Sequence, residues 1–266
     1  MLNVIPIPAF EDNYIWLIQN IRNNHAVVVD PGDAAPVIET LQRKNLTLEA
    51  IFVTHHHHDH TGGISDLLVS SQIAKTAQLE VYGPSSSKIP SITYPVKQDS
   101  CVYLNNLETD FEVLEVPGHT LDHIAFYTKK RLFCGDTLFG AGCGRLFEGT
   151  PQQMVNSLNK LAQLPSDTEI YCAHEYTLAN LKFAEFVEPS NKDIQKRIIA
   201  SNQLLTARKC TLPSSLSLEL ATNPFLRCHF DSIKNSATQS TGQPLDAYNE
   251  VFAAIRRMKD QFVVSS

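Results

Sequence analysis

The sequence predicts a mixed α/β domain followed by a smaller all-helical domain. The first 175 residues contain many short apolar or alternating stretches, most of them bounded by Gly, Pro, Asn or Asp, which is the pattern of β-strands. A few stretches with helical periodicity lie between these strands. Beyond residue 175 the hydrophobic pattern changes from short strand-like stretches to longer stretches with helical periodicity. We therefore predict one domain over 1–175 and a second, helical domain over 176–266.

The strands expected in the first domain are short runs, most of them bounded by a turn-forming residue. These strands are Asn3–Ile7, Tyr14–Gln19, Ala26–Asp30, Ala50–Thr54, Glu80–Tyr82, Phe111–Val116, His123–Thr128, Leu132–Gly135 and Glu169–Ala173. Helices are expected at Ala35–Lys44, Ile64–Lys75 and Gln152–Gln163. Residues 83–100, GPSSSKIPSITYPVKQDS, are expected to form a surface connection.

The second domain is expected to contain three helices. Their periodic patterns cover Leu178–Val187, Asp193–Lys209 and Ala247–Phe262. The polar stretch CHFDSIKNSATQSTGQPLD at 228–246 lies between the last two and is predicted to be a loop.

Composition excludes several classes of protein. The net charge of -6 argues against broad capture of nucleic acid or of an anionic membrane. No apolar stretch approaches the roughly 20 residues that span a bilayer, and the N-terminal residues do not resemble a signal peptide. The six cysteines are scattered and include no C-x-x-C pair. We therefore expect a cytoplasmic protein with reduced thiols and no nucleic-acid or membrane partner. A monomer is expected as well.

The stretch THHHHDHTGG at 54–63 follows an apolar strand and holds five histidines around one aspartate. Side chains of an extended chain alternate between two sides. If the extended geometry continues, His55 and His57 point one way and His56 and His58 the other. His55 and His57 are therefore predicted to bind metal, and His56 and His58 to support the site, pack or face solvent.

Asp59 and His60 form a second predicted pair of ligands where the chain turns. Two pairs on one short loop indicate two ions side by side, and each ion needs further ligands because a zinc-like site takes about four. Later apolar strands end in His119, Asp136 and His174. The predicted sets are His55, His57 and His119 for one ion and Asp59, His60 and His174 for the other, with Asp136 between them. Asp30, after the strand VVV, is expected either to orient a ligand histidine or to form a turn.

The histidine cluster with its later His, Asp and His resembles the metallo-β-lactamase superfamily. That resemblance implies a four-layered αββα sandwich with the metals at one edge. The superfamily hosts many reactions, so this likeness alone leaves the function open.

Four further stretches are similar to glyoxalase II, the family of hydroxyacylglutathione hydrolases. They are GCGRLFEGT at 142–150, AHEYTLANLKFA at 173–184, NPFLR at 223–227 and RRMKDQF at 256–262. The resemblance covers essentially the whole chain. It implies hydrolysis of the thioester S-D-lactoylglutathione to glutathione and D-lactate, the second step of methylglyoxal detoxification. It also implies two divalent metal ions, zinc in the first place, with iron or manganese as alternatives.

The resemblance further implies which residues bind the glutathione thioester. They are Arg145, Phe147, His174, Tyr176, Asn180, Arg256 and Lys259. Glutathione carries two carboxylates, for which the two arginines and the lysine offer cationic donors. Position 145 is often Lys in the family and position 147 commonly Tyr, so Arg145 and Phe147 are departures that are expected to alter affinity.

The expected reaction uses a hydroxide that bridges the two ions and attacks the thioester carbonyl. Asp59 and Asp136 are the predicted catalytic carboxylates, and the thiolate can leave without a proton donor. One alternative is a glutathione-persulfide dioxygenase with a single iron on the same fold. A non-catalytic or nucleic-acid-processing member of the superfamily is another.

Overall fold

The computed structural model describes residues 1–70 and 79–263, and the chain forms two compact units. Unit 1 comprises Met1–Glu115 and Asp122–Gly135, and unit 2 comprises Val116–Leu121 and Asp136–Ser266. These units are compact parts of the folded chain, whereas the predicted domains were divided where the hydrophobic pattern of the sequence changes. The division into 1–175 and 176–266 therefore stays a prediction.

Unit 1 contains a six-stranded sheet in the order β1-β2-β3-β4-β5-β6. The strands are β1 (Leu2–Ala9), β2 (Asn13–Asn20), β3 (His25–Val29), β4 (Thr47–Phe52), β5 (Glu80–Pro84) and β6 (Tyr94–Val96). The first three are antiparallel and the remaining pairings are parallel. Parallel neighbours bring the loops that follow β3 and β4 to the same edge of the sheet, where Asp30 and the histidine cluster lie.

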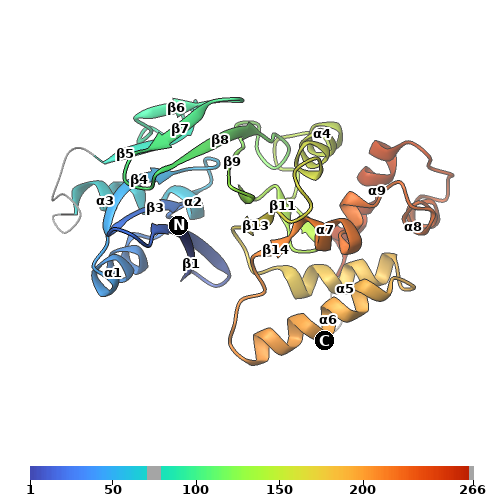
Figure 1. Cartoon of the computed structure of the whole chain (residues 1–266). Coiled ribbons are helices and arrows are strands. Elements are labelled where there is room, and N and C mark those ends of the chain that lie inside the picture. The colour runs from blue at the N-terminus through green and yellow to red at the C-terminus, as the bar shows by residue number, and fades with distance from the viewer. Residues whose placement is uncertain (71–78, 264–266) are drawn as a thin grey trace. The chain divides into compact units, whose positions relative to one another are not determined.

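Helices α1 (Ala34–Lys44) and α3 (Ile64–Val69) pack on one face of this sheet (Figure 1). Helix α1 begins at Asp33, whose side chain accepts a hydrogen bond from the backbone of Ala35, and ends at Asn45 in the left-handed conformation. Its apolar face joins Ile51 and Val53 in one buried cluster. The side chains of β4 alternate, so Phe52 points to the opposite face.

A second, antiparallel set of strands covers that opposite face within unit 1. It runs in the order β10 (Arg131–Gly135), β9 (Ile124–Thr128), β8 (Thr109–Glu115) and β7 (Cys101–Leu104). The ring of Phe52 stacks on Phe126 with centroids 4.3 Å apart and meets the edge of Phe111 at 4.8 Å. Unit 1 therefore has a helical layer, a sheet and a second sheet, with aromatic packing between the sheets.

Unit 2 consists mainly of helices. It contains the hairpin β11 (Leu138–Phe139) and β12 (Gly142–Cys143), the paired strands β13 (Glu169–Cys172) and β14 (Ser214–Ser215), and the helices α4 (Pro151–Ala162), α5 (Thr177–Val187), α6 (Lys192–Thr206), α7 (Leu216–Thr222), α8 (Asp231–Thr241) and α9 (Tyr248–Gln261), with a 3-10 turn at Pro224–Leu226. Helices α5 and α6 run side by side (Figure 1). Phe225 lies between Phe183 and Phe252 in the core. Within the described ranges, no helix is long and apolar enough to cross a membrane.

The predicted loop at 228–246 is wrong, because residues Asp231–Thr241 form helix α8. Only Ile233 and Ala237 of this helix are buried, one turn apart, so its apolar stripe is too narrow to stand out in a polar sequence. Gly242 ends the helix at a φ of +69°, a left-handed position that suits glycine.

Other differences concern elements that were not predicted, such as strand β7 and helix α7, and the ends of elements that were. Strand β4 ends at Phe52 rather than Thr54, and the second half of the histidine cluster forms a short helix, α2 (His58–Thr61). Helix α3 ends at Val69, and the remainder of the predicted helix to Lys75 enters 71–78, outside the described residues. The expected surface connection at 83–100 contains β6, which pairs with β5.

Candidate metal centre and substrate pocket

Two histidines after β4 face each other in unit 1. Nε2 of His55 and Nδ1 of His57 lie 3.1 Å apart. His56 points elsewhere, with its Nδ1 2.9 Å from a carboxylate oxygen of Asp122, and His58 is exposed. The side chains therefore alternate as predicted, although the strand itself ends earlier.

Asp59 and His60 form a second close pair on helix α2. Oδ2 of Asp59 lies 3.3 Å from Nε2 of His60. The same oxygen accepts a 3.0 Å hydrogen bond from the amide of Asn13, a buried residue at the start of β2. The sequence prediction missed Asn13, because nothing in the stretch FEDNY distinguishes it from an ordinary turn residue.

The carboxylate of Asp30 orients two of the buried histidines of unit 1, His55 and His60. Its Oδ2 accepts hydrogen bonds from Nδ1 of His60 at 3.0 Å and from the hydroxyl of Thr54 at 2.7 Å. Since that hydroxyl donates to Asp30, it accepts from Nδ1 of His55 at 3.0 Å. Both rings thus carry their proton on Nδ1, which leaves Nε2 as the nitrogen that could bind a metal. Orienting a histidine was one of the two roles predicted for Asp30.

Asp136 lies between two histidines in unit 2. Its Oδ2 is 3.4 Å from Nε2 of His119, and its Oδ1 is 3.4 Å from Nε2 of His174. All three side chains are buried. Nδ1 of His119 donates to the backbone carbonyl of Arg145 at 2.8 Å, which leaves Nε2 to face Asp136. Each carboxylate oxygen therefore faces a different imidazole, as in a carboxylate that bridges two ions.

The spacing of these atoms fits a divalent metal ion. Two ligands at about 2.0–2.1 Å from a tetrahedral zinc ion lie about 3.3 Å apart. The pairs within unit 1 are separated by 3.1 Å and 3.3 Å, and those within unit 2 by 3.4 Å. Four of the predicted ligands belong to unit 1 and three to unit 2.

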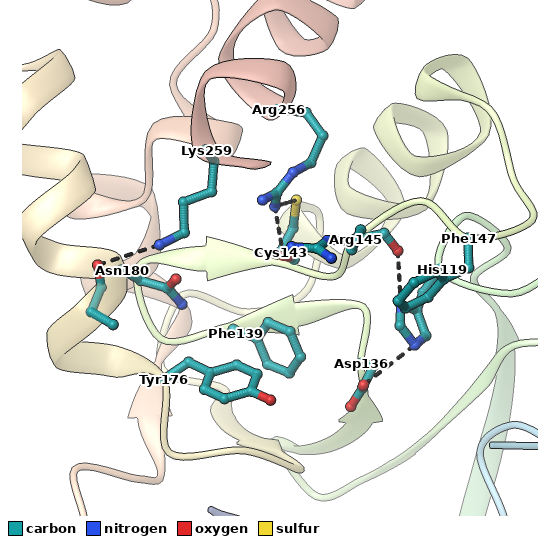
Figure 2. A pocket seen from close by; sticks show the side chains of 11 residues that line it. His119, Asp136, Phe139, Cys143, Arg145, Phe147, Tyr176, Asn180, Arg256 and Lys259 are labelled. Atoms are coloured by element: carbon teal, nitrogen blue, oxygen red, sulfur yellow. Dashed lines mark hydrogen bonds and ion pairs between the residues drawn. The ribbon is translucent and has the colours of Figure 1, made fainter. Parts of the chain in front are cut away.

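Unit 2 also contains a cavity of about 380 Å³ (Figure 2). It is lined by His119, Asp136, Phe139, Cys143, Arg145, Phe147, Tyr176, Ala179, Asn180, Arg256 and Lys259. Two predicted metal ligands and most of the predicted substrate residues thus line the same cavity. His174 is not among the lining residues, but its ring stacks on that of Tyr176 with centroids 4.8 Å apart.

A carboxylate joins the two arginines of this cavity. Oδ1 of Asp260 lies 3.2 Å from Nε and 3.0 Å from Nη2 of Arg256, and 3.5 Å from Nε of Arg145. Nη1 of Arg256 donates to the carbonyl of Cys143 at 3.0 Å (Figure 2). Asp260 was not predicted, although its place four residues after Arg256 is the spacing of a helical ion pair. It holds the two guanidinium groups at one edge of the cavity.

The ammonium group of Lys259 is partly withdrawn from water. Its Nζ lies 3.4 Å from the carbonyl of Ala179 and 5.5 Å from the ring centre of Phe183. Desolvation, aided by the charge of Arg256, lowers the pKa of Lys259 to about 8. An anionic ligand in the cavity would favour the charged form of this side chain.

The remaining predicted substrate residues differ in their surroundings. Asn180 is buried and its amide donates to the carbonyl of Gly140 at 3.0 Å, so part of its hydrogen-bonding capacity serves the protein itself. Phe147 is 61% exposed, and its ring meets the edge of His119 at 5.3 Å. Phe147 therefore offers an apolar surface beside a predicted metal ligand.

Two family models match successive parts of the chain. Residues 9–174 match the metallo-beta-lactamase superfamily, and residues 175–262 match the model described as the hydroxyacylglutathione hydrolase C-terminus. Together the matches span both the predicted metal ligands and the helices that follow.

Relatives and solved structures extend the comparison over nearly the full length. The chain is 52% identical to a hydroxyacylglutathione hydrolase of Photobacterium profundum and 49% identical to one of Nitrosomonas eutropha, with 98% of this chain and 100% of each relative covered. Among solved structures, ETHE1 from Myxococcus xanthus has a TM-score of 0.63 at 24% identity, covering 97% of this chain and 98% of the other. That likeness concerns the fold alone.

Proposed function

Because the chain belongs to the hydroxyacylglutathione hydrolase family of the metallo-β-lactamase superfamily, we propose that it hydrolyses glutathione thioesters of 2-hydroxy acids, chiefly S-D-lactoylglutathione. The products are glutathione and D-lactate, and the reaction is the second step of methylglyoxal detoxification. The protein is thus a thioester hydrolase on the four-layered αββα fold with a helical C-terminal part.

The dioxygenase alternative does not hold. The chain matches the hydroxyacylglutathione hydrolase C-terminus over 175–262, and its relatives of that name are covered over their whole length. Both comparisons favour the hydrolase.

The superfamily fold and its histidine and aspartate cluster support a divalent metal. We propose two ions, zinc in the first place, with iron or manganese as alternatives. One observation supports two ions in place of one: the two oxygens of Asp136 each lie 3.4 Å from a different histidine. The proposed ligand sets are His55, His57 and His119 for one ion and Asp59, His60 and His174 for the other, with Asp136 shared.

The cavity in unit 2 supplies the proposed glutathione site. Arg145, Arg256 and Lys259 give it three cationic side chains, and Asp260 offsets one of these charges. The surplus of positive charge suits the two carboxylates of glutathione. Phe147, Tyr176 and Asn180 complete the proposed contacts, with His174 beneath the ring of Tyr176.

The chemistry follows from the substrate and from these side chains. When bound, the divalent ions supply a coordinated water with a pKa near 7 and stabilisation of charge on the thioester oxygen. Asp59, held by the amide of Asn13, is placed to orient a nucleophilic oxygen as well as to bind metal. The leaving thiolate needs no proton donor, because its conjugate acid has a pKa of about 8.5.

We also propose that the first predicted domain binds the metal and that the second contributes to substrate binding. The metal ligands all lie within 1–175, and Tyr176, Asn180, Arg256 and Lys259 come from 176–266. One chain carries every proposed ligand and substrate residue, so a monomer suffices. All six cysteines are free, in keeping with a reducing, cytoplasmic location.

The test is hydrolysis of S-D-lactoylglutathione, followed at the thioester absorbance, with metal analysis of the same sample. We expect turnover in the metal-containing protein, loss of turnover after chelation, and recovery when zinc is returned. Oxygen uptake with glutathione persulfide in place of hydrolysis would reverse the assignment.

A further inference from the structure

The turn between β11 and β12 is held by side chains from the helices of unit 2. Every residue from 139 to 143 has a backbone atom bonded in this way. The bonds run from Asn223 Nδ2 to Phe139 O (3.2 Å) and Gly142 O (2.8 Å), from Asn180 Nδ2 to Gly140 O (3.0 Å), from Ala141 N to Glu219 Oε2 (2.8 Å), and from Arg256 Nη1 to Cys143 O (3.0 Å). A two-stranded ribbon this short has few backbone bonds of its own, so these side chains define its position.

The backbone at the tip of the turn is strained. Ala141 is buried and has a φ of +53°, a conformation that is unfavourable for a residue with a Cβ. A Cβ at Gly142 would overlap the side-chain amide of Asn180, so helix α5 approaches the turn as closely as glycine permits. Strain of this kind persists where the surroundings over-determine the conformation.

Two of these side chains, Glu219 and Asn223, bind the backbone of the turn but do not line the cavity. Glu219 is fully buried, and its Oε1 pairs with Nη2 of Arg197 at 2.6 Å while Oε2 holds Ala141. Asn223, also fully buried, donates to both strands of the hairpin and keeps its Oδ1 for the backbone of Phe225. The stretch NPFLR begins with this asparagine.

The turn lies between the two functional parts of unit 2. Asp136 precedes β11 by two residues, and Arg145 follows β12 by two. Phe139 and Cys143 of the hairpin itself line the cavity (Figure 2). A displaced hairpin would therefore move Arg145 relative to Asp136.

We propose that Glu219 and Asn223 are positioning residues for glutathione binding. By fixing the backbone of the β11–β12 turn, they set the cavity wall and the place of Arg145. This inference rests on the proposed function for the identity of the ligand. The C-terminal helices would then have two roles: direct contact with the substrate and support of the turn beside it.

The test uses Asn223→Ser in the full-length metal-containing protein. Serine retains an oxygen that can accept from the backbone of Phe225, but it cannot donate to the two hairpin carbonyls. We expect the Kd for glutathione, measured by calorimetry, and the KM for S-D-lactoylglutathione to rise about tenfold. Metal content should stay unchanged, and kcat should change by less than about threefold.

The matched control is Glu188→Gln. Glu188 is a buried carboxylate of the same helices that accepts from Arg227 and Ser232 and does not touch the hairpin. This variant should lower the thermal midpoint but leave Kd and KM as in the unaltered protein. Hydrogen exchange at the amides of 140–143 should accelerate in Asn223→Ser and not in the control. If both variants lose stability alike and neither alters Kd or exchange, the residues are merely structural and the proposal is wrong.

Two further measurements keep the outcome decisive. Should Asn223→Ser fail to fold, Glu219→Gln replaces it, because Arg197 and Ala141 donate to different oxygens of Glu219 and glutamine would present its NH2 group, a donor, to one of them. Should both fail, glutathione added to the unaltered protein must slow exchange at 140–143, and unchanged rates would overturn the inference. If the unaltered protein neither binds glutathione nor hydrolyses the thioester, the proposed function itself is at fault.

Discussion

Nδ1 of His119 donates a hydrogen bond of 2.8 Å to the backbone carbonyl of Arg145. The first residue is a proposed metal ligand, and the side chain of the second lines the proposed glutathione cavity. The bond fixes which nitrogen of His119 can bind a metal, and the loop that carries Arg145 supplies it. We therefore expect a change in that loop to alter both metal binding and substrate binding.

Asp136→Asn should reduce metal content and thioester turnover together. The amide keeps the shape of the side chain but has one oxygen in place of two and no charge, so it cannot face both His119 and His174 as a ligand. We expect fewer than two ions per chain by elemental analysis and a fall in kcat of at least about 100-fold. Full turnover in a metal-free variant would contradict the proposed mechanism.

Asp30→Asn should weaken metal binding without removing a proposed ligand. Asp30 directs Nδ1 of His60, and of His55 through Thr54, and loss of such partners typically costs 10- to 100-fold in metal affinity. Competition with a chromophoric chelator measures the change. Asp33→Asn is the control, because Asp33 caps α1 and asparagine caps equally well. Equal metal affinity in both variants would show that Asp30 does not help the histidines to bind metal.

The KM for the glutathione thioester should rise as pH increases through about 8. Desolvation lowers the pKa of Lys259 to about 8, so its charge is present below that pH and is lost above it. Only the charged form attracts a substrate carboxylate. Lys259→Arg keeps its charge throughout this range and should show a flatter profile of KM against pH. Identical profiles for the two proteins would exclude Lys259 as the titrating group.

Phe147→Tyr should lower KM by about 2- to 12-fold. The substitution adds a hydroxyl at the cavity wall, and one neutral hydrogen bond contributes about 0.5–1.5 kcal/mol. Because Phe147 is 61% exposed, the thermal midpoint should not change. Phe186→Tyr is the control, an equally exposed ring on α5 that does not line the cavity. An unchanged KM would mean that the hydroxyl finds no acceptor in the substrate complex.

Local patterns in the sequence were enough to predict most of the helices, and they supplied the proposed metal ligands. Helices α5 and α9 begin and end within one residue of their predicted bounds, because a periodic apolar face is a local property. The pairing of His55 with His57 followed from side-chain alternation over three residues. Helix α8 escaped prediction because only two of its residues are buried.

Only the tertiary structure revealed the partners that hold these residues in place. Asn13 reaches Asp59 across 46 positions, and Glu219 reaches Ala141 across 78. No local pattern encodes such pairs, since they form only when burial of apolar faces brings distant backbone and side chains together. The sequence by itself determined the chemical types of side chain from which a metal site and a carboxylate site are proposed. Packing within each unit decided their tautomers, their charge partners and the strained turn on which the cavity depends.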